Sequence, residues 1–416
     1  MVKEDGAPSS LDKLITGIWE QIHGSIGLDP GLMVEQLHEN HALEGSPSVT
    51  DPNSPSGHVA LAAFSGAFSQ MNVLCRKITQ ASRCCRSLEV IVQARWVEYF
   101  DARVQQLAAS GGGGSLTKNR MYALKEACED FGWTEKELRN KMAVWRGYQE
   151  IKEAGGWVSL VFAGIGLYRF CKYRIGFSKE AMQRLQSLRR RFEVAADTLH
   201  PHWRELLPII GEPSERVYDG HPHDWVVSEQ NEPIPLRQTY LQWDLNFTFK
   251  HLEESVIDED AWGPLWDPRR PTPAATDVAT SGAYICDVCG ERQEDDPKEN
   301  YCRCFPALYG CIRQACPVQV FRTANGRNNG LEACLPFPRG TAIGEFTGLL
   351  TRHFTNTDVM VGQPSPSSPT YQIHQGRQGN YTRFVNHSCC PNAQFERFSW
   401  RGVQRIVLVS HLAQPH

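Results

Sequence analysis

Residues 383–392, Arg-Phe-Val-Asn-His-Ser-Cys-Cys-Pro-Asn, form the stretch that decides the fold of this chain. Asparagine, histidine, serine and cysteine side chains, which bind ligands and carry chemistry, follow one another here almost without interruption. Gly379 and Asn380 stand a few residues before this stretch, and the segment QRIVLVS at residues 404–410 reads as a strand after it. Such a density of polar side chains beside a strand indicates a functional site.

A second block, residues 321–350, has the sequence FRTANGRNNGLEACLPFPRGTAIGEFTGLL. Its order predicts a glycine-rich turn, a strand, a Pro-Arg-Gly turn at residues 338–340 and another strand. The C-terminal part of the chain is therefore expected to be built mainly of short strands.

These blocks together resemble the SET domain of protein-lysine methyltransferases. Residues 383–392 match the family signature RFxNHSCxPN, and Gly379-Asn380 stands where the family has GN. The segment RGTAIGEFTG at residues 339–348 is similar to the family's KGxxIGEYxG strand pair, and residues 404–410 resemble the strand after the signature. The resemblance covers about residues 320–413. The chain resembles a fungal type of SET protein. This resemblance implies a β-clip of short strands and the transfer of a methyl group from S-adenosylmethionine to a lysine amine, most often in a histone tail.

The resemblance also implies a set of contacts to S-adenosylmethionine. In the signature, Asn386 offers a donor and an acceptor for the amino acid end of the ligand, the backbone at His387 can pair with adenine, and Phe384 can stack nearby. On the opposite side of the ligand, the backbone of a glycine turn is expected to approach the ligand, because glycine has no side chain to block this contact. The turn reads Asn328-Asn329-Gly330 where the family has an aromatic residue, so one stacking surface is lost. The predicted contacts are Asn329, Gly330, Arg383, Phe384, Asn386 and His387.

Methyl transfer is an in-line displacement, so the main task of such a site is to hold a neutral amine on the axis of the methyl carbon. A lysine amine has a pKa near 10.4 in water, and an apolar channel lowers that pKa by desolvation. Phe346, Tyr371 and Phe395 are candidates for lining the channel. Tyr371 is also the predicted catalytic hydroxyl, by its position relative to the family, and a plain buried tyrosine is the alternative.

Six cysteines lie in the short segment before the SET-like blocks, with the spacing C-x2-C-x12-C-x-C-x6-C-x4-C. A CxxC pair turns both sulfurs toward one ion, and a second close pair completes a tetrahedral zinc site. Cys286, Cys289, Cys302 and Cys304 are the best such set. Cys311 and Cys316 either complete a second metal position or remain without metal. The predicted zinc is structural, because ligation stabilises a segment too short for its own core. Unligated reduced thiols are the alternative.

The length of 416 residues indicates several domains. We expect a mostly disordered segment at residues 1–60 that carries one amphipathic stretch at residues 11–26, and an all-α domain at residues 61–205. Thr134 and Glu137 form a predicted capping box, after which a helix should run to Glu153 and end at Gly155 and Gly156. A Pro- and aromatic-rich connector at residues 206–280 follows, then the cysteine-rich, pre-SET-like zinc module at residues 281–317 and a SET domain at residues 318–416.

The composition narrows the range of partners. The net charge of −4 argues against a surface that wraps nucleic acid, although a local basic patch would not change that sum. The arginine run at residues 189–191 is typical of a solvated helix face. The apolar run at residues 157–170 is shorter than the roughly 20 residues of a membrane span and is predicted to be a buried helix. No membrane contact is therefore expected.

Two further groups of side chains, one aromatic and one of histidines, have no predicted chemical role. Trp133, Trp145, Trp157 and Tyr168 are expected to be helical core side chains. The histidines at positions 200, 202, 221 and 223 lack the spacing of a metal site and are expected to be ordinary surface histidines.

Two functions remain open on the sequence. The first is a lysine methyltransferase that acts on a histone or another protein in the nucleus, on the chromosome, with direct nucleic-acid contact left open. The second is a noncatalytic zinc-dependent chromatin or transcription protein that keeps the SET scaffold for binding. The family continues after its last strand to a GEExTxDY segment with an active-site tyrosine, whereas this sequence stops at His416, so we expect an incomplete SET domain and a weakened or absent activity.

Overall fold

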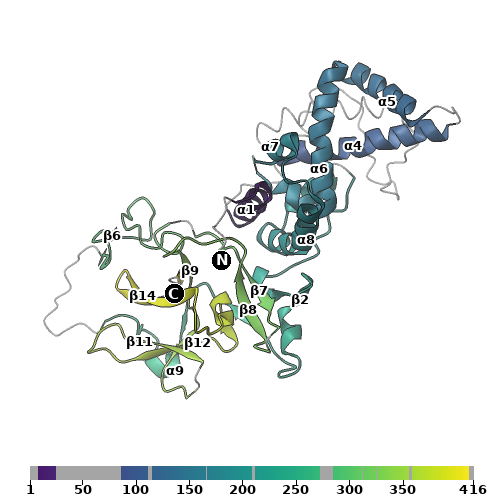
Figure 1. The fold of residues 1–416 in the computed structure, drawn as a ribbon. Helices are drawn as coiled ribbons and strands as arrows, with labels where there is room; N and C mark the ends of the chain where they lie inside the picture. The colour runs from purple at the N-terminus through teal and green to yellow at the C-terminus, as the bar shows by residue number, and fades with distance from the viewer. Residues whose placement is uncertain are drawn as a thin grey trace, which may run out of the picture. The chain divides into compact units, whose positions relative to one another are not determined.

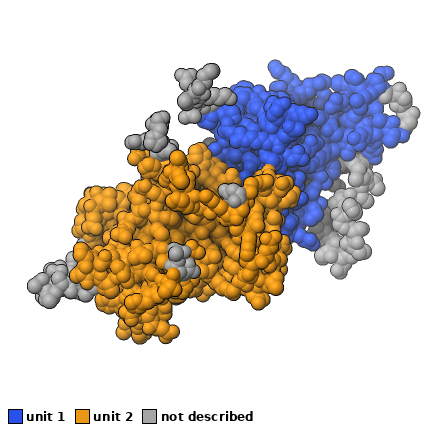
Figure 2. Space-filling model, turned by 60° about the horizontal axis from the view of Figure 1, so that its bottom comes forward, with its two compact units in different colours: residues 1–220 blue, residues 221–416 orange. Residues whose placement is uncertain are grey.

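The computed structural model of the chain describes residues 8–24, 86–110, 115–164, 166–208, 211–271, 284–311, 313–324, 326–355 and 358–411. The chain divides into two compact units, residues 1–220 and residues 221–416, which Figure 2 colours separately. Most of the segment at residues 1–60 that was expected to be disordered, the start of the predicted all-α domain up to residue 85, and the end of the predicted connector from residue 272 lie outside the described residues.

The described residues of the first unit form helices and no strand, as predicted for the N-terminal half (Figure 1). The helices are α1 (Ser10–His23), α4 (Arg86–Ala109), α5 (Leu116–Phe131), α6 (Glu135–Val161), α7 (Gly166–Tyr173), α8 (Lys179–Leu199) and the short 3-10 helix η1 (Trp203–Leu206). Across the parts of the chain that the structure describes, no helix combines the length and the apolar character needed to cross a membrane.

Helix α6 bears on two local predictions, its N-terminal cap and its end at Gly155 and Gly156. The Thr134 hydroxyl accepts a hydrogen bond from the backbone of Glu137, whose carboxylate accepts one from the backbone of Thr134 at 2.9 Å, so the capping box is confirmed. The predicted end at Gly155 and Gly156 coincides with a break in helical geometry at Gly156 (φ 74°, ψ 174°), beyond which a second helical stretch runs to Val161 within α6. The positive φ of Gly156 is a conformation that favours glycine.

The first unit has its own core of large aromatic side chains. Trp19 of α1 packs on Phe192 of α8 with ring centres 4.7 Å apart, which ties the amphipathic stretch at residues 11–26 to the helical unit. Trp96 of α4 and Trp145 of α6 meet edge to face at 5.1 Å. The buried Asp197 carboxylate accepts hydrogen bonds from the Trp203 indole, the Arg204 guanidinium and two backbone N–H groups, so its burial leaves no unsatisfied charge.

The second unit consists of short strands, as the SET-like blocks predicted (Figure 1). Its strands are β1 (Trp225–Val227), β2 (Pro233–Pro235), β3 (Lys250–His251), β4 (Val256–Ile257), β5 (Tyr284–Ile285), β6 (Arg292–Gln293), β7 (Val318–Arg322), β8 (Asn329–Ala333), β9 (Ala342–Glu345), β10 (Leu349–Thr351), β11 (Val359–Gly362), β12 (Tyr371–His374), β13 (Gln378–Gly379), β14 (Ala393–Trp400) and β15 (Val403–Ser410). They pair in the orders β2-β1-β7-β8, β11-β12-β10-β4, β14-β15-β9, β13-β3 and β5-β6. Four short helices lie between them, η3 (Pro222–Asp224), η4 (Leu236–Tyr240), α9 (Glu259–Trp262) and η5 (Tyr381–Phe384).

The stretch predicted as a connector, residues 206–280, is divided differently in the structure. From His221 onward it belongs to the second unit, where β1, β3 and β4 each pair in parallel with a strand of the SET-like region: β7, β13 and β10, respectively. These strands have only two or three residues each, so their pairing depends on partners about 90 or more positions away and leaves little local signal.

The cysteine-rich segment packs on the hairpin of β14 and β15. Cys286, Cys302 and Tyr309 share one buried cluster with Phe398 and Trp400 of β14. Polar bonds reinforce this contact, since the Trp400 indole donates to Asp295 at 3.0 Å and the backbone of Arg401 donates to Gln293 at 2.8 Å. The segment is therefore held against the strand that follows the signature.

Candidate functional site

The site begins at the tight turn that joins β7 to β8. Arg322 pairs with Asn329 and Phe321 with Gly330 across the hairpin, and the backbone of Thr323 donates to the carbonyl of Asn328 at 2.9 Å. Asn328 lies in the left-handed region (φ 62°), which asparagine tolerates better than most residues. Its side-chain oxygen is buried and has no hydrogen-bond partner among the residues that the structure describes.

The signature segment is held in place from its first turn. Asn380 caps η5, its side-chain oxygen accepting from the backbone of Thr382 at 3.1 Å, and its amide donates to the carbonyl of Glu345 at 2.7 Å. Tyr381 donates to the carbonyl of Ile343 at 2.7 Å. Both bonds end on β9, so the GN pair and the residue after it fix the signature to the core strand.

The turn and the signature meet directly. The side-chain amide of Asn386 donates to the carbonyl of Asn329 at 3.0 Å, and the guanidinium of Arg327 donates to the carbonyl of His387 at 2.7 Å. A Cβ added at Gly330 would lie 2.6 Å from the Phe321 ring and 3.1 Å from the Asn386 amide nitrogen. Only glycine leaves room for this contact. The predicted approach of this backbone to a ligand stays a prediction.

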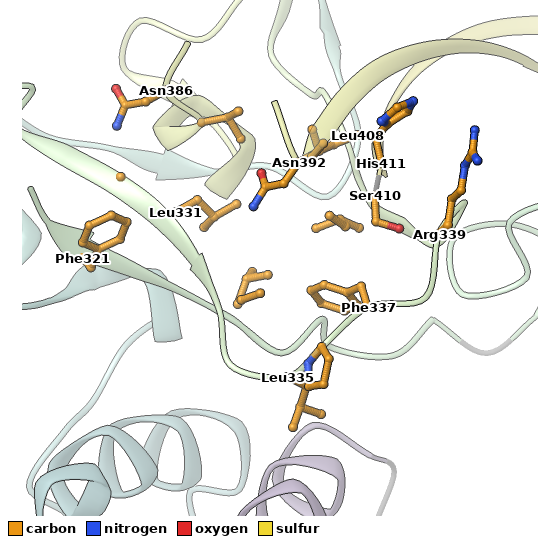
Figure 3. A pocket seen from close by; sticks show the side chains of 17 residues that line it. Phe321, Leu331, Leu335, Phe337, Arg339, Asn386, Asn392, Leu408, Ser410 and His411 are labelled. Atoms are coloured by element: carbon orange, nitrogen blue, oxygen red, sulfur yellow. The ribbon is translucent and has the colours of Figure 1, made fainter. Parts of the chain in front are cut away.

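Gly330 and Asn386 line a cavity of about 420 Å³ (Figure 3), which falls within the usual range for small-molecule sites. Asn386 and Phe321 lie toward one end of it, and Arg339 and His411 toward the other. The walls between them are mostly apolar and come from β7, β8 and β15. The full lining is Val318, Phe321, Gly330, Leu331, Ala333, Leu335, Pro336, Phe337, Arg339, Ile343, Val385, Asn386, Asn392, Ala393, Leu408, Ser410 and His411.

The other predicted contacts lie elsewhere in this structure. The Phe384 ring is buried among Val226, Leu236, Phe247 and Val320, on the side of the signature that faces β1. Arg383 donates to the carbonyl of Gln375 and lies over the Phe249 ring at 5.7 Å. His387 is exposed.

The three aromatic side chains predicted for the lysine channel do come together. Phe346 and Tyr371 belong to one buried cluster, and Phe395 packs against it with its ring perpendicular to that of Phe346 at 5.4 Å. Tyr371 is fully buried, and its hydroxyl donates to the side-chain oxygen of Gln404 at 3.1 Å. Burial raises the pKa of Tyr371 to about 12, so the hydroxyl keeps its proton at neutral pH.

Four of the six clustered cysteines form a group that fits zinc. The sulfurs of Cys286, Cys289, Cys302 and Cys304 all lie within 4.8 Å of one another, and those of Cys289 and Cys302 are 3.6 Å apart. Zinc–sulfur bonds of about 2.3 Å in a tetrahedron place sulfurs about 3.8 Å apart, so the spacing matches. The backbone N–H of Glu291 lowers the pKa of the Cys289 thiol to about 7, which favours the thiolate that metal requires.

Cys311 and Cys316 are not members of the four-thiol group. Cys316 packs instead against Val318, Ile343 and Leu408 and contacts the Tyr381 side chain. Burial raises the pKa of the Cys316 thiol to about 12. Its surroundings are those of a core thiol.

Sequence reasoning missed Arg327 and Phe321, which the structure places at the junction of turn and signature. Arg327 had a local signal, because it is a cation two residues before Asn329, which is a predicted ligand contact. Phe321 had none, because its position under Gly330 follows from the pairing register of β7 and β8.

Comparison with known proteins adds to this geometry. The family described as SET domain matches residues 328–411. A "SET domain-containing protein" of Phaeosphaeria nodorum is 54% identical over 407 residues, which cover 97% of this chain and 65% of the relative. "Histone-lysine N-methyltransferase ash1" of Drosophila melanogaster is 27% identical over 214 residues, 46% of this chain and 9% of that protein. The crystal structure of KRYPTONITE with mCHG DNA and SAH is 20% identical over 39% of this chain and 38% of that one, with a TM-score of 0.25.

The chain spans about two thirds of the length of its Phaeosphaeria nodorum relative, and that relative and the family match agree on the same domain. The matched residues include the signature, the asparagine-glycine turn and the strands that bring them together. The C-terminal part of this chain therefore carries a SET domain, at residues 328–411.

Proposed function

We propose that the C-terminal unit binds S-adenosylmethionine and transfers its methyl group to a lysine of a protein, most often a histone tail. The observation that carries this proposal is the bond from the Asn386 amide to the Asn329 carbonyl, which joins the signature to the glycine turn at the edge of a ligand-sized cavity. Relatives named histone-lysine N-methyltransferases support the same reaction class.

The residues at this junction fit such a ligand. Gly330 and Asn386 line the cavity together, and Asn328 beside them has a buried side-chain oxygen with no hydrogen-bond partner among the described residues. In the proposal Asn386 holds the amino acid end, the backbone of His387 pairs with adenine, and the Asn329–Gly330 backbone supports the ligand from the opposite side. Arg383 and Phe384 support the site indirectly, because they hold the signature against residues 221–251. Arg383 lies over the Phe249 ring, and Phe384 packs among Val226, Leu236 and Phe247.

S-adenosylmethionine supplies a methyl group on a positively charged sulfur. A lysine nitrogen attacks with its lone pair, so it must first lose a proton to solvent. The aromatic cluster of Phe346, Tyr371 and Phe395 provides apolar surroundings that lower the lysine pKa by desolvation.

Tyr371 is the proposed catalytic hydroxyl, and Gln404 is the residue that orients it through the 3.1 Å bond. The same bond and the complete burial of Tyr371 favour the second candidate function, a SET scaffold that binds without turnover. Binding and turnover must therefore be measured separately.

Calorimetry of the full chain with S-adenosylmethionine tests binding, and a radiolabel transfer assay on histone octamers tests turnover. The methyltransferase proposal expects both, with binding abolished or strongly weakened in Asn386→Ala. Binding without transfer would support the noncatalytic function, and the absence of both would reject the proposal. Gln394→Ala is the matched control, because this exposed side chain on β14 donates only to neighbouring Glu396.

We also propose one structural zinc ion on Cys286, Cys289, Cys302 and Cys304. Its role would be to hold the cysteine segment on β14, where Cys286 and Cys302 already pack. Metal analysis should give one zinc per chain, and removal with a chelator should lower the stability of the second unit.

The proposed site of action is chromatin in the nucleus, as the names of the histone-lysine methyltransferase relatives indicate. Fluorescent tagging of the full-length protein in its host cell would check this, and exclusion from the nucleus would contradict it.

A further inference from the structure

The helical unit has a surface that the proposed methyl transfer does not use. Two hollows flank the exposed Ala143 of α6 and share it in their lining, and we call them together the α6 groove. One hollow, of about 450 Å³, lies among α4, α5 and α6, and the other, of about 660 Å³, lies among α4, α6 and α7. Because Ala143 is small, a ligand that enters one hollow can continue into the other.

Charge is distributed unevenly in the α6 groove. Six cationic side chains line it, against two acidic ones. The cations are Arg120, Arg139 and Arg146 in the first hollow and Arg86, Lys141 and Lys172 in the second, and the acids are Glu89 and Glu137. The groove is thus cationic in a chain whose formal charge is −4.

Four of these cations form no salt bridge with any described residue: Arg86, Arg120, Lys141 and Lys172. Of these, Lys141 interacts electrostatically with Glu137, one turn earlier on α6. Lys141 lies over the Trp133 ring at 4.9 Å, and Lys172 lies over the Tyr168 ring at 5.6 Å. The two acids are already engaged, since Glu137 accepts from Thr134 at the cap of α6 and Glu89 accepts from Gln93. Positive charge is therefore left for a ligand to neutralise.

The floor of the α6 groove is apolar. Phe100, Leu124 and Met142 form the bottom of the first hollow, and Trp145 and Tyr148 that of the second. All five are buried, so they offer apolar surface to a side chain that reaches down but no free ring face for a stacking base. An apolar floor under a cationic rim matches a peptide that carries both acidic and apolar side chains.

We propose that the α6 groove binds an acidic, amphipathic segment of a partner protein. The carboxylates of that segment pair with the four cations that form no salt bridge, and its apolar side chains enter the two hollows on either side of Ala143. The proposal is independent of methyl transfer, because every residue involved lies in the first unit.

The test uses the full chain and a fluorescent probe peptide of about 18 residues, or about five helical turns, in which pairs of glutamate alternate with pairs of leucine. Anisotropy should show saturable binding that weakens as salt is added. The double variant Lys141→Glu/Lys172→Glu should raise Kd about tenfold, since each reversal replaces a surface attraction by a repulsion. Arg120→Glu should weaken binding from the other hollow.

Lys179→Glu is the matched control, because Lys179 is an exposed lysine at the start of α8 and does not line the groove. It should leave Kd within about twofold of the wild type. No binding by the wild-type chain, or an equal loss in the control, would overturn the proposal. A single-stranded oligonucleotide that binds more tightly than the peptide, and is lost in the same double variant, would overturn it in favour of nucleic acid.

Discussion

Replacement of Gly330 by alanine tests the junction on which the proposed ligand site depends. The new Cβ would lie 2.6 Å and 2.8 Å from two carbons of the Phe321 ring, where ordinary contact begins at 3.4 Å. The ring or the strand must therefore shift by close to 1 Å, and such overpacking costs about 1–3 kcal/mol of folding free energy. The shift also separates the Asn386 amide from the Asn329 carbonyl, a bond worth about 1 kcal/mol.

We expect Gly330→Ala to lower the unfolding free energy of the second unit by about 1–3 kcal/mol in chemical denaturation. S-adenosylmethionine should bind about tenfold more weakly by calorimetry, which corresponds to about 1.4 kcal/mol. The double variant Phe321→Ala/Gly330→Ala should recover part of the binding, since it removes the ring that the new Cβ meets.

Gly166→Ala is the control for the substitution itself, because a Cβ there would meet no atom within 4 Å. It should leave both the stability of the second unit and ligand binding unchanged. If Gly330→Ala were as stable as the wild type and bound the ligand equally well, the close approach of turn and signature would not matter, and the reasoning would be refuted.

Three further predictions concern other parts of the chain. Cys289→Ser should abolish stoichiometric zinc in metal analysis, whereas Cys311→Ser should retain it; retention in both would reject the four-thiol site. Tyr371→Phe should lower kcat of methyl transfer by at least about tenfold with little change in ligand Kd if the hydroxyl acts on the amine, and an unchanged kcat would leave Tyr371 a packing residue. Thr134→Ala should lower the stability of the helical unit by about 1 kcal/mol, whereas Ser115→Ala, whose hydroxyl makes no capping bond, should not; equal effects would contradict the capping-box argument.

Several features of this protein could be predicted from the sequence because each depends only on neighbouring residues. The signature at residues 383–392, the GN pair before it and the Thr134 capping box all consist of neighbouring residues whose chemistry requires that spacing. The four-thiol group was found from the CxxC spacing for the same reason. These features fixed the family and the all-α and mainly β character of the two halves.

Other features depend on partners distant in the sequence. Asn386 and Asn329 are 57 positions apart, and nothing in either segment tells which atom of one meets which atom of the other. The role of residues 221–257 depends on the pairing of β1, β4 and β3 with β7, β10 and β13, respectively. In each case the outcome follows from how whole elements pack.

The sequence by itself thus determined the SET signature, the thiol spacing and the helix caps, because a few adjacent side chains suffice for each. Only the tertiary structure decided that the Tyr371 hydroxyl bonds to Gln404, that Phe384 faces the core and that the α6 groove is cationic over an apolar floor. Side-chain direction and burial are set by the packing of distant elements, and that information is spread over the whole chain.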